Sequence, residues 1–164
     1  MGQILLARID DRLVHGQVIT RWATGRGCNA IFVVDDLLAR DQLMKNVYSM
    51  TGKASGLLVK VMSVNEAAEN WEKDGFGNHK VIMLFKTVDI VREVVKKGLP
   101  IKEINVGGLA RKADSIPVIP SASLTRPEME VLKELHETYH VEIFFQTLPD
   151  TKTVSLDRAL ELFK

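Results

Sequence analysis

The densest group of reactive side chains in the sequence lies near its N-terminus. Two arginines, two aspartates and one histidine stand within eight residues, and they are Arg8, Asp10, Asp11, Arg12 and His15. A neutral imidazole is a good nucleophile through one ring nitrogen while an acceptor holds the other, and guanidinium groups bind phosphoryl oxygens two at a time. The segment therefore has the residues to carry a phosphoryl group on His15, with Arg8 or Arg12 as its clamp.

The carboxylates and the residues after the histidine fit the same chemistry. Asp10 or Asp11 could orient the ring or the arginines, because a hydrogen bond at one imidazole nitrogen fixes the tautomer that the other presents. A helix is expected to begin near Gly16, where its first N–H groups would stabilise an anion. Gly16 and Gln17 are therefore candidates for a phosphate site. The alternative is that His15 is an ordinary loop histidine beside solvated ion pairs.

The rest of the chain alternates short β-rich runs with amphipathic stretches, which is typical of βα units and a mainly parallel sheet. Most of the predicted strands are apolar nearly throughout, as strands covered on both faces should be. They are 4–7, 30–34, 57–62, 80–85, 103–106, 116–119 and 141–145. The predicted fold class is α/β, with an open, mostly parallel twisted sheet of about seven strands, helices on both faces, and a single domain over residues 1–164.

Three amphipathic stripes predict helices that bury one face in the core. The stripes are Val18, Ile19, Trp22 and Ala23; Leu43, Met44, Val47 and Met50; and Val91, Val94 and Val95. Ser63 with Glu66 and Thr125 with Glu128 fit the capping box that begins a helix. A last helix is expected over 155–163.

Ligands of an open α/β sheet bind beyond the carboxyl ends of its strands, so the residues that follow the other strands also matter. Lys86 follows one predicted strand and is either a second cation for a phosphoryl group or a solvated lysine. Gly107 and Gly108 follow another, where they either allow positive φ in a turn or let a backbone amide face the phosphate. Asp36 and Thr87 are explained as helix N-caps.

Composition and charge exclude several classes of protein. A chain with 46% hydrophobic and 26% charged residues is not a disordered tail, a fibre or a coiled coil. The formal net charge of +1 provides no global field to recruit nucleic acid or an acidic membrane surface. Cys28 is the single cysteine and cannot form an internal disulfide. No apolar run approaches the ~20 residues of a membrane span or suits a signal peptide, so we expect a soluble protein.

Familiar cofactor and metal motifs do not fit the sequence. The segment 52–53 resembles the end of a P-loop, but Ala54 stands where Ser or Thr would bind magnesium, and no GxGxxG follows a strand. A response-regulator receiver needs an aspartate at the end of its third strand, which this chain lacks. His136 and His140 have a metal-ligand spacing, yet no HExxH pattern or nearby cysteine supports a metal site.

Residues 8–18, which read RIDDRLVHGQV, resemble the active-site loop of the IIB component of the mannose/fructose/sorbose class of the bacterial sugar phosphotransferase system (PTS). The resemblance continues through VVDD at 33–36, LFK at 84–86 and NVGG at 105–108, in the family's order and spacing. It therefore covers essentially the full chain. It implies an open twisted sheet of seven mostly parallel strands with helices on both faces, and no metal or organic cofactor.

The resemblance also implies a function, that of a protein-phosphohistidine–sugar phosphotransferase. His15 would accept a phosphoryl group on its δ1 nitrogen from a phosphohistidine of the IIA component, then pass it to a sugar held by the membrane components IIC and IID. Arg8 and Arg12 would contact the phosphoryl group or shape the loop, and Asp10 would support the loop geometry. The protein would be cytoplasmic, peripherally associated with the transporter, and would bind no nucleic acid.

Two segments depart from the family pattern. Asp35-Asp36 stands where many relatives have Asn-Asp, which adds a negative charge near the expected site, and the segment 51–56 lacks the prolines that relatives tend to have. Neither departure touches the histidine motif. The rival function is a non-catalytic α/β module that binds a phosphorylated metabolite reversibly through the loop 8–15 and forms no phosphoprotein.

Overall fold

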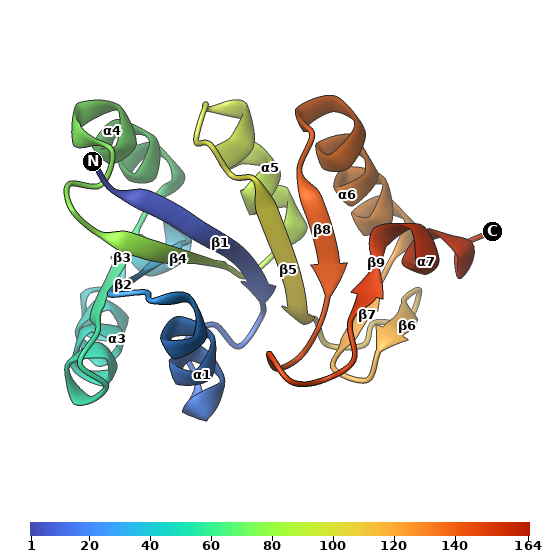
Figure 1. The fold of residues 1–164 in the computed structure, drawn as a ribbon, viewed down its shortest axis with the longest axis horizontal. Helices are drawn as coiled ribbons and strands as arrows, with labels where there is room; N and C mark the ends of the chain where they lie inside the picture. Colours follow the sequence, from blue (N-terminus) through green and yellow to red (C-terminus); the bar gives the residue numbers. More distant parts are fainter.

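The computed structural model describes residues 1–164, except for the side chains of residues 17–19. Within this described part, seven strands form the main sheet (Figure 1). Their spatial order is β3 (Leu58–Met62), β2 (Ala30–Val34), β4 (Lys80–Phe85), β1 (Gln3–Asp10), β5 (Glu103–Gly108), β8 (Glu142–Phe145) and β9 (Val154–Ser155). The pairings are parallel except for that of β8 with β9. The predicted α/β class and the mostly parallel sheet are confirmed.

Helices cover both faces of this sheet, as predicted (Figure 1). One face carries α4 (Val64–Asp74), α5 (Val88–Lys96) and α6 (Arg126–Tyr139), and the opposite face carries α1 (Gly16–Arg26) and α3 (Gln42–Ala54). The short helices are α2 (Asp36–Ala39) and α7 (Leu156–Glu161). Among the residues that the structure describes, no helix combines the length and the apolar character needed to span a lipid bilayer.

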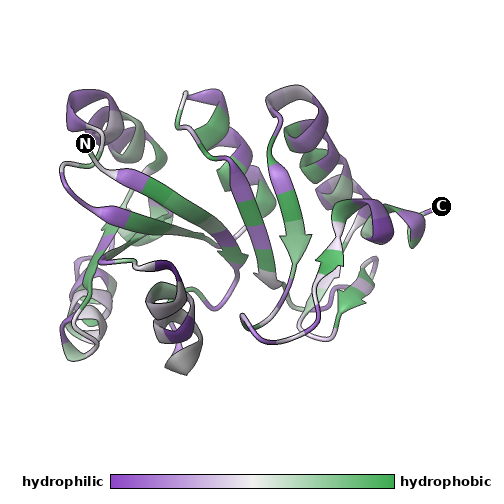
Figure 2. Ribbon diagram, in the orientation of Figure 1, coloured by the Kyte–Doolittle hydropathy of each residue, from purple (hydrophilic) through white to green (hydrophobic). Residues whose placement is uncertain are grey.

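Two apolar clusters follow from the alternation of side chains along the strands. Ala7 and Ile9 of β1 belong to the larger cluster, which α5 and α6 cover, whereas Leu6 belongs to the smaller cluster with Trp22 of α1. Figure 2 shows the strands of the main sheet as mostly hydrophobic, with hydrophilic segments inside β1 and β5. Those polar interruptions lie on the α1 face and mark the candidate site described below.

Most of the helix starts predicted from the sequence are confirmed. Both capping boxes are present, at Ser63 for α4 and at Thr125 for α6, and Thr87 is the N-cap of α5. The predicted N-cap at Asp36 is wrong, because the Asp35 carboxylate accepts the capping hydrogen bond from Leu38 N. Asp36 accepts instead from the backbone N–H of Val64, at the start of α4.

One predicted strand of the main sheet is misplaced. β6 (Ile116–Ile119) pairs antiparallel with β7 (Ala122–Leu124) in a separate two-stranded sheet, which a bridge between Leu109 and Ala122 joins to the end of β5. The seventh strand of the main sheet is the two-residue β9, which is too short to give a periodic signal. The main sheet therefore has the predicted number of strands, seven, but β9 takes the place of the predicted strand 116–119.

The apolar stripe predicted to bury α3 is also wrong. Leu43 and Met50 are 72% and 68% exposed. The helix contacts the sheet through Tyr48 and Gly52, and a Cβ at Gly52 would lie 2.5 Å from Cγ2 of Val59. Because α3 lies over the edge strand β3, the face with Tyr48 and Gly52 meets the sheet and most of the predicted stripe stays exposed. The stripes of α1 and α5 are buried at their described positions, while Val18 and Ile19 lie outside the described side chains.

Candidate functional site

The first strand is longer than the sequence predicts, and this places two of the candidate residues inside the sheet. β1 runs through Asp10, so Arg8 and Asp10 lie in the strand and not in the loop that follows it. Being two residues apart, they point to the same face, toward α1. Both side chains are fully buried. The strand continues past its apolar run because the two charges pair with each other, through a 3.1 Å contact between Arg8 Nη2 and Asp10 Oδ2.

The Asp10 carboxylate is the centre of the site. It accepts hydrogen bonds from Arg8, from the guanidinium and backbone N–H of Arg12, and from the ring of His15. The Arg12 contacts use both carboxylate oxygens, with Nε at 3.1 Å from Oδ1 and Nη2 at 3.2 Å from Oδ2. The four catalytic candidates are thus connected to one another through Asp10.

The charge state of Asp10 follows from this environment. Burial by itself would raise the pKa of Asp10, but the hydrogen bonds from Arg12 and His15, with the charge of Arg8, outweigh burial and lower it. The pKa of Arg8 is lowered by burial, against the opposing attraction of Asp10. Near neutral pH the site therefore holds a buried carboxylate anion between two guanidinium cations.

Arg8 has no route to solvent. Its Nη1 donates to Asn105 Oδ1 and to the carbonyl of Gln146, and its Nη2 donates to the carbonyl of Thr147 as well as to Asp10. Its guanidinium carbon lies 5.2 Å from the ring centroid of Trp22. Arg8 therefore binds the Asp10 carboxylate from the buried side of the site. Of the two arginines, only Arg12 reaches the surface, where its side chain is half exposed.

Gly107 and Gly108 leave the space that the buried side chains of Arg8 and Asp10 occupy. A Cβ at Gly107 would lie 2.1 Å from Arg8 Cζ, and one at Gly108 would lie 2.6 Å from Asp10 Oδ1. Both residues lie in β5, and neither has a positive φ, so the predicted turn role is wrong. The glycines are there because the Arg8 and Asp10 side chains occupy the space that Cβ atoms would need.

His15 lies at the end of the loop that joins β1 to α1, directly before the helix. It is the N-cap residue of α1, and Gly16 begins the helix with φ +48°. The ring is 23% exposed and lies with Nε2 3.1 Å from Asp10 Oδ2. No hydrogen bond to Nδ1 is formed by the described residues. The side chain of Gln17, the other phosphate-site candidate here, lies outside the described residues.

The remaining candidates lie at the same edge of the sheet but outside this group. Lys86 is exposed and directly follows β4, whose Phe85 pairs with Ile9 of β1. Asp11 accepts a hydrogen bond from the backbone N–H of Ala110, which ties the histidine loop to the segment after β5. Within the described part of the chain, no group of three or more His, Cys, Asp or Glu side chains is arranged to hold a metal ion.

Sequence reasoning missed the residues that hold Arg8 in place. Asn105 donates from Nδ2 to the Gln146 carbonyl, and Trp22 Nε1 donates to the Thr147 carbonyl. Backbone acceptors such as these carry no residue-type signal. Asn105 does carry one, because it is a polar residue inside an otherwise apolar strand.

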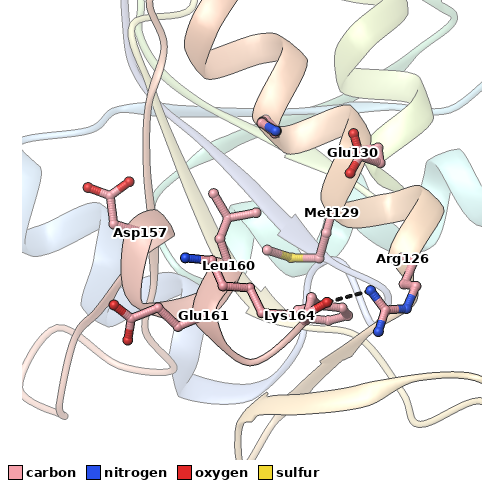
Figure 3. A pocket seen from close by; sticks show the side chains of 9 residues that line it. Arg126, Met129, Glu130, Asp157, Leu160, Glu161 and Lys164 are labelled. Carbon is pink, nitrogen blue, oxygen red and sulfur yellow. Dashed lines mark hydrogen bonds between the residues drawn. The ribbon is translucent and has the colours of Figure 1, made fainter.

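A cavity of about 430 Å³ lies elsewhere, between α6 and α7 (Figure 3). Met129 and Leu160 form part of its apolar wall, and Arg126 donates a hydrogen bond to the carbonyl of Phe163 at its rim. None of its lining residues belongs to the group around Asp10. The cavity and the histidine site are therefore separate features.

The chain matches a known protein family over nearly its whole length. Residues 4–163 match the family described as PTS system sorbose subfamily IIB component. The PTS system sorbose-specific EIIB component of Lacticaseibacillus casei is 31% identical over 134 residues, which cover 82% of this chain and 81% of that protein. The PTS system mannose-specific EIIAB component of Escherichia coli K12 is 32% identical over 131 residues, 80% of this chain and 40% of that longer protein.

The fold has solved relatives as well. The crystal structure of manxB from Thermoanaerobacter tengcongensis is 39% identical and superposes with a TM-score of 0.90, covering 98% of this chain and 96% of the other. With the family match spanning nearly every residue, the chain belongs to the sorbose subfamily of PTS IIB components.

Proposed function

We propose that His15 is the phosphoryl-carrying residue of this IIB component, accepting the group from a phosphohistidine of a IIA component and passing it to a sugar held by the membrane components IIC and IID. The observation that carries the proposal is the state of the His15 ring. Asp10 holds Nε2, while Nδ1 is left without a partner among the described residues, at the N-terminus of α1.

The mechanism follows from the tautomer that Asp10 selects. A carboxylate that accepts from Nε2–H leaves the lone pair on Nδ1, which is the nucleophilic atom. As Nδ1 forms its bond to phosphorus, the bond from phosphorus to the donor histidine breaks. The imidazole of His15 gains positive charge during this step, and the Asp10 anion stabilises that charge. In the second transfer the sugar hydroxyl attacks phosphorus, its proton passes to a base in the sugar site of IIC and IID, and the bond from phosphorus to Nδ1 breaks as the neutral imidazole leaves.

Arg12 is the proposed clamp for the phosphoryl oxygens. Two of its guanidinium nitrogens bind Asp10, and its side chain is half exposed, so the remaining N–H groups of the guanidinium can meet an incoming anion. The backbone N–H groups at the start of α1 also favour an anion at this place. The first turn carries no acidic side chain that would oppose their effect. Lys86 is a proposed second cation. Arg8 supports the site without contacting the phosphoryl group.

The proposed partners are therefore proteins more than small molecules. The sugar binds to IIC and IID, and this chain meets it at the cytoplasmic face of that complex. The fusion of A and B components in the E. coli relative, named as an EIIAB component, supports a IIA partner. The names of the relatives include both sorbose and mannose.

Intact-mass measurement after incubation with phosphoenolpyruvate, the general PTS proteins and a IIA component of this class tests the proposal. We expect one acid-labile phosphate on the parent chain and on His140→Asn, and none on His15→Ala. His140 is a matched control because it is exposed at the C-cap of α6 in a left-handed conformation that Asn tolerates. A folded parent that takes up no phosphate contradicts the proposal and favours reversible binding of a phosphorylated metabolite.

A further inference from the structure

Asn105 is fully buried in the middle of β5, between apolar neighbours. A buried amide without partners costs several kcal/mol, so such a residue needs a reason to be there. Both ends of its side chain are used: Oδ1 accepts from Arg8 Nη1, and Nδ2 donates to the Gln146 carbonyl at 3.1 Å. Asn105 thus joins β1 to the segment that follows β8.

A continuous set of hydrogen bonds leads from this amide to the reacting ring. Arg8 binds Asn105 through Nη1 and Asp10 through Nη2, and the Asp10 oxygen that Arg8 contacts, Oδ2, also contacts His15 Nε2 at 3.1 Å. The Asn105 end is anchored on main chain, because the Gln146 carbonyl accepts from both Asn105 and Arg8. The position of the Asp10 carboxylate against His15 therefore depends on how Arg8 is held.

We propose that Asn105 is a positioning residue for phosphoryl transfer, which fixes Arg8 so that Arg8 holds Asp10 against His15 Nε2. This inference rests on the proposed function of His15. The neutrality of the amide is part of the role. A carboxylate in its place would share Arg8 with Asp10 and would place a second anion near a site that must accept a phosphoryl group.

The geometry of β5 supports this assignment. The pairing of β1 with β5 shifts register between Ile9, opposite Val106, and Asp10, opposite Gly108. The shift brings Gly108 beside Asp10, while Gly107, two residues after Asn105, lies beside Arg8. One strand thus supplies a polar partner for Arg8 and the empty space that both charged side chains require.

The test compares Asn105→Asp with Asn29→Asp in the full chain. Both variants add one negative charge, but the Asn29 side chain precedes β2 at the opposite end of the strands, where its Oδ1 accepts from the Lys80 N–H, and Asp keeps that acceptor. We measure the imidazole pKa of His15 by NMR titration and the single-turnover rate of phosphorylation by phospho-IIA. For Asn105→Asp we expect a His15 pKa higher by at least about 0.5 unit and a phosphorylation rate lower by tenfold or more. Asn29→Asp should match the parent in both.

A second variant guards against misfolding. Asn105→Ala keeps the site neutral but removes the partner of Arg8 Nη1, so we expect slower phosphorylation with a smaller change in the His15 pKa. A folded Asn105→Asp or Asn105→Ala protein that keeps the parental His15 pKa and the parental phosphorylation rate overturns the proposal. Failure of both variants to fold also overturns it, because Asn105 would then serve stability alone. If the parent accepts no phosphate, the proposed function fails, while the pKa comparison still decides whether Asn105 positions His15.

Discussion

At the scale of single residues, the site is governed by one buried carboxylate. Asp10 binds Arg8, Arg12 and His15, and its lowered pKa keeps it ionised at neutral pH. Removing one partner of a buried ion pair leaves the other charge uncompensated, which costs more than the pair contributes. The same carboxylate therefore serves stability and the orientation of the imidazole.

Replacement of Asp10 by Asn tests the contribution of this carboxylate to stability. We expect Asp10→Asn to lose about 3–5 kcal/mol of unfolding free energy at neutral pH, because Arg8 stays buried without its counter-ion. Chemical denaturation measures the loss.

The pH dependence of this loss follows from the lowered pKa of Asp10 in the folded state. Such a group stabilises the fold above its unfolded pKa of about 3.9, and that stabilisation is lost as the pH falls toward the folded pKa. The gap between parent and Asp10→Asn should therefore narrow below about pH 4. A gap that stays constant from pH 7 to pH 3 contradicts the assigned ion pair.

Arg12 allows a test of the clamp that leaves the fold in place. Its side chain is half exposed and Asp10 keeps Arg8 as a counter-ion, so Arg12→Ala should lower the unfolding free energy less than Asp10→Asn does. The rate of phosphorylation in a single turnover should fall by as much as about 10³-fold, as for arginines that stabilise other phosphoryl transfers. Arg40→Ala, at the exposed end of α2, is the matched control. A parental rate for Arg12→Ala makes Arg12 a structural residue.

At the scale of elements, β1 and β5 build the site together. β1 contributes the buried charges and β5 contributes Asn105 and the two glycines. The four reactive candidates could be picked out from the sequence because they are close together in one motif, and the structure places them in contact with one another. The sequence did not predict Asn105 as a partner, because a contact between residues 97 positions apart has no local pattern.

The glycines of β5 provide a sharp test of this packing. Gly107→Ala should lower the unfolding free energy by roughly 1–3 kcal/mol, because its Cβ would overlap the Arg8 guanidinium. Gly25→Ala, where no atom lies within 4 Å of the added Cβ in α1, should raise it by about 0.5–1 kcal/mol. Thermal or denaturant unfolding of the two variants gives the comparison, and equal effects contradict the assignment.

The outward face of α3 is tested by methionine substitutions. Met50→Gln should change the unfolding free energy by no more than about 0.5 kcal/mol, because the side chain is largely exposed. Met129→Gln in α6 makes the same chemical change at a position 2% exposed, and it should cost more than about 2 kcal/mol. A large loss for Met50→Gln shows that the α3 stripe is covered in solution.

At the scale of the whole molecule, much of the fold was predictable because parallel strands covered on both faces leave continuous apolar runs. The errors share a physical cause. The segment 116–119 resembles a sheet strand locally, but its hairpin with β7 places it outside the main sheet, and β9 is too short to show a pattern. Apolar periodicity likewise located α3 without telling which of its two faces meets β3.

NMR of the phosphorylated, ¹⁵N-labelled protein decides whether His15 carries the phosphoryl group on Nδ1 while Asp10 holds Nε2. We expect a single ³¹P signal coupled to Nδ1 of His15, with the proton of that ring on Nε2. A phosphoryl group on Nε2, on another residue, or on none would contradict this assignment.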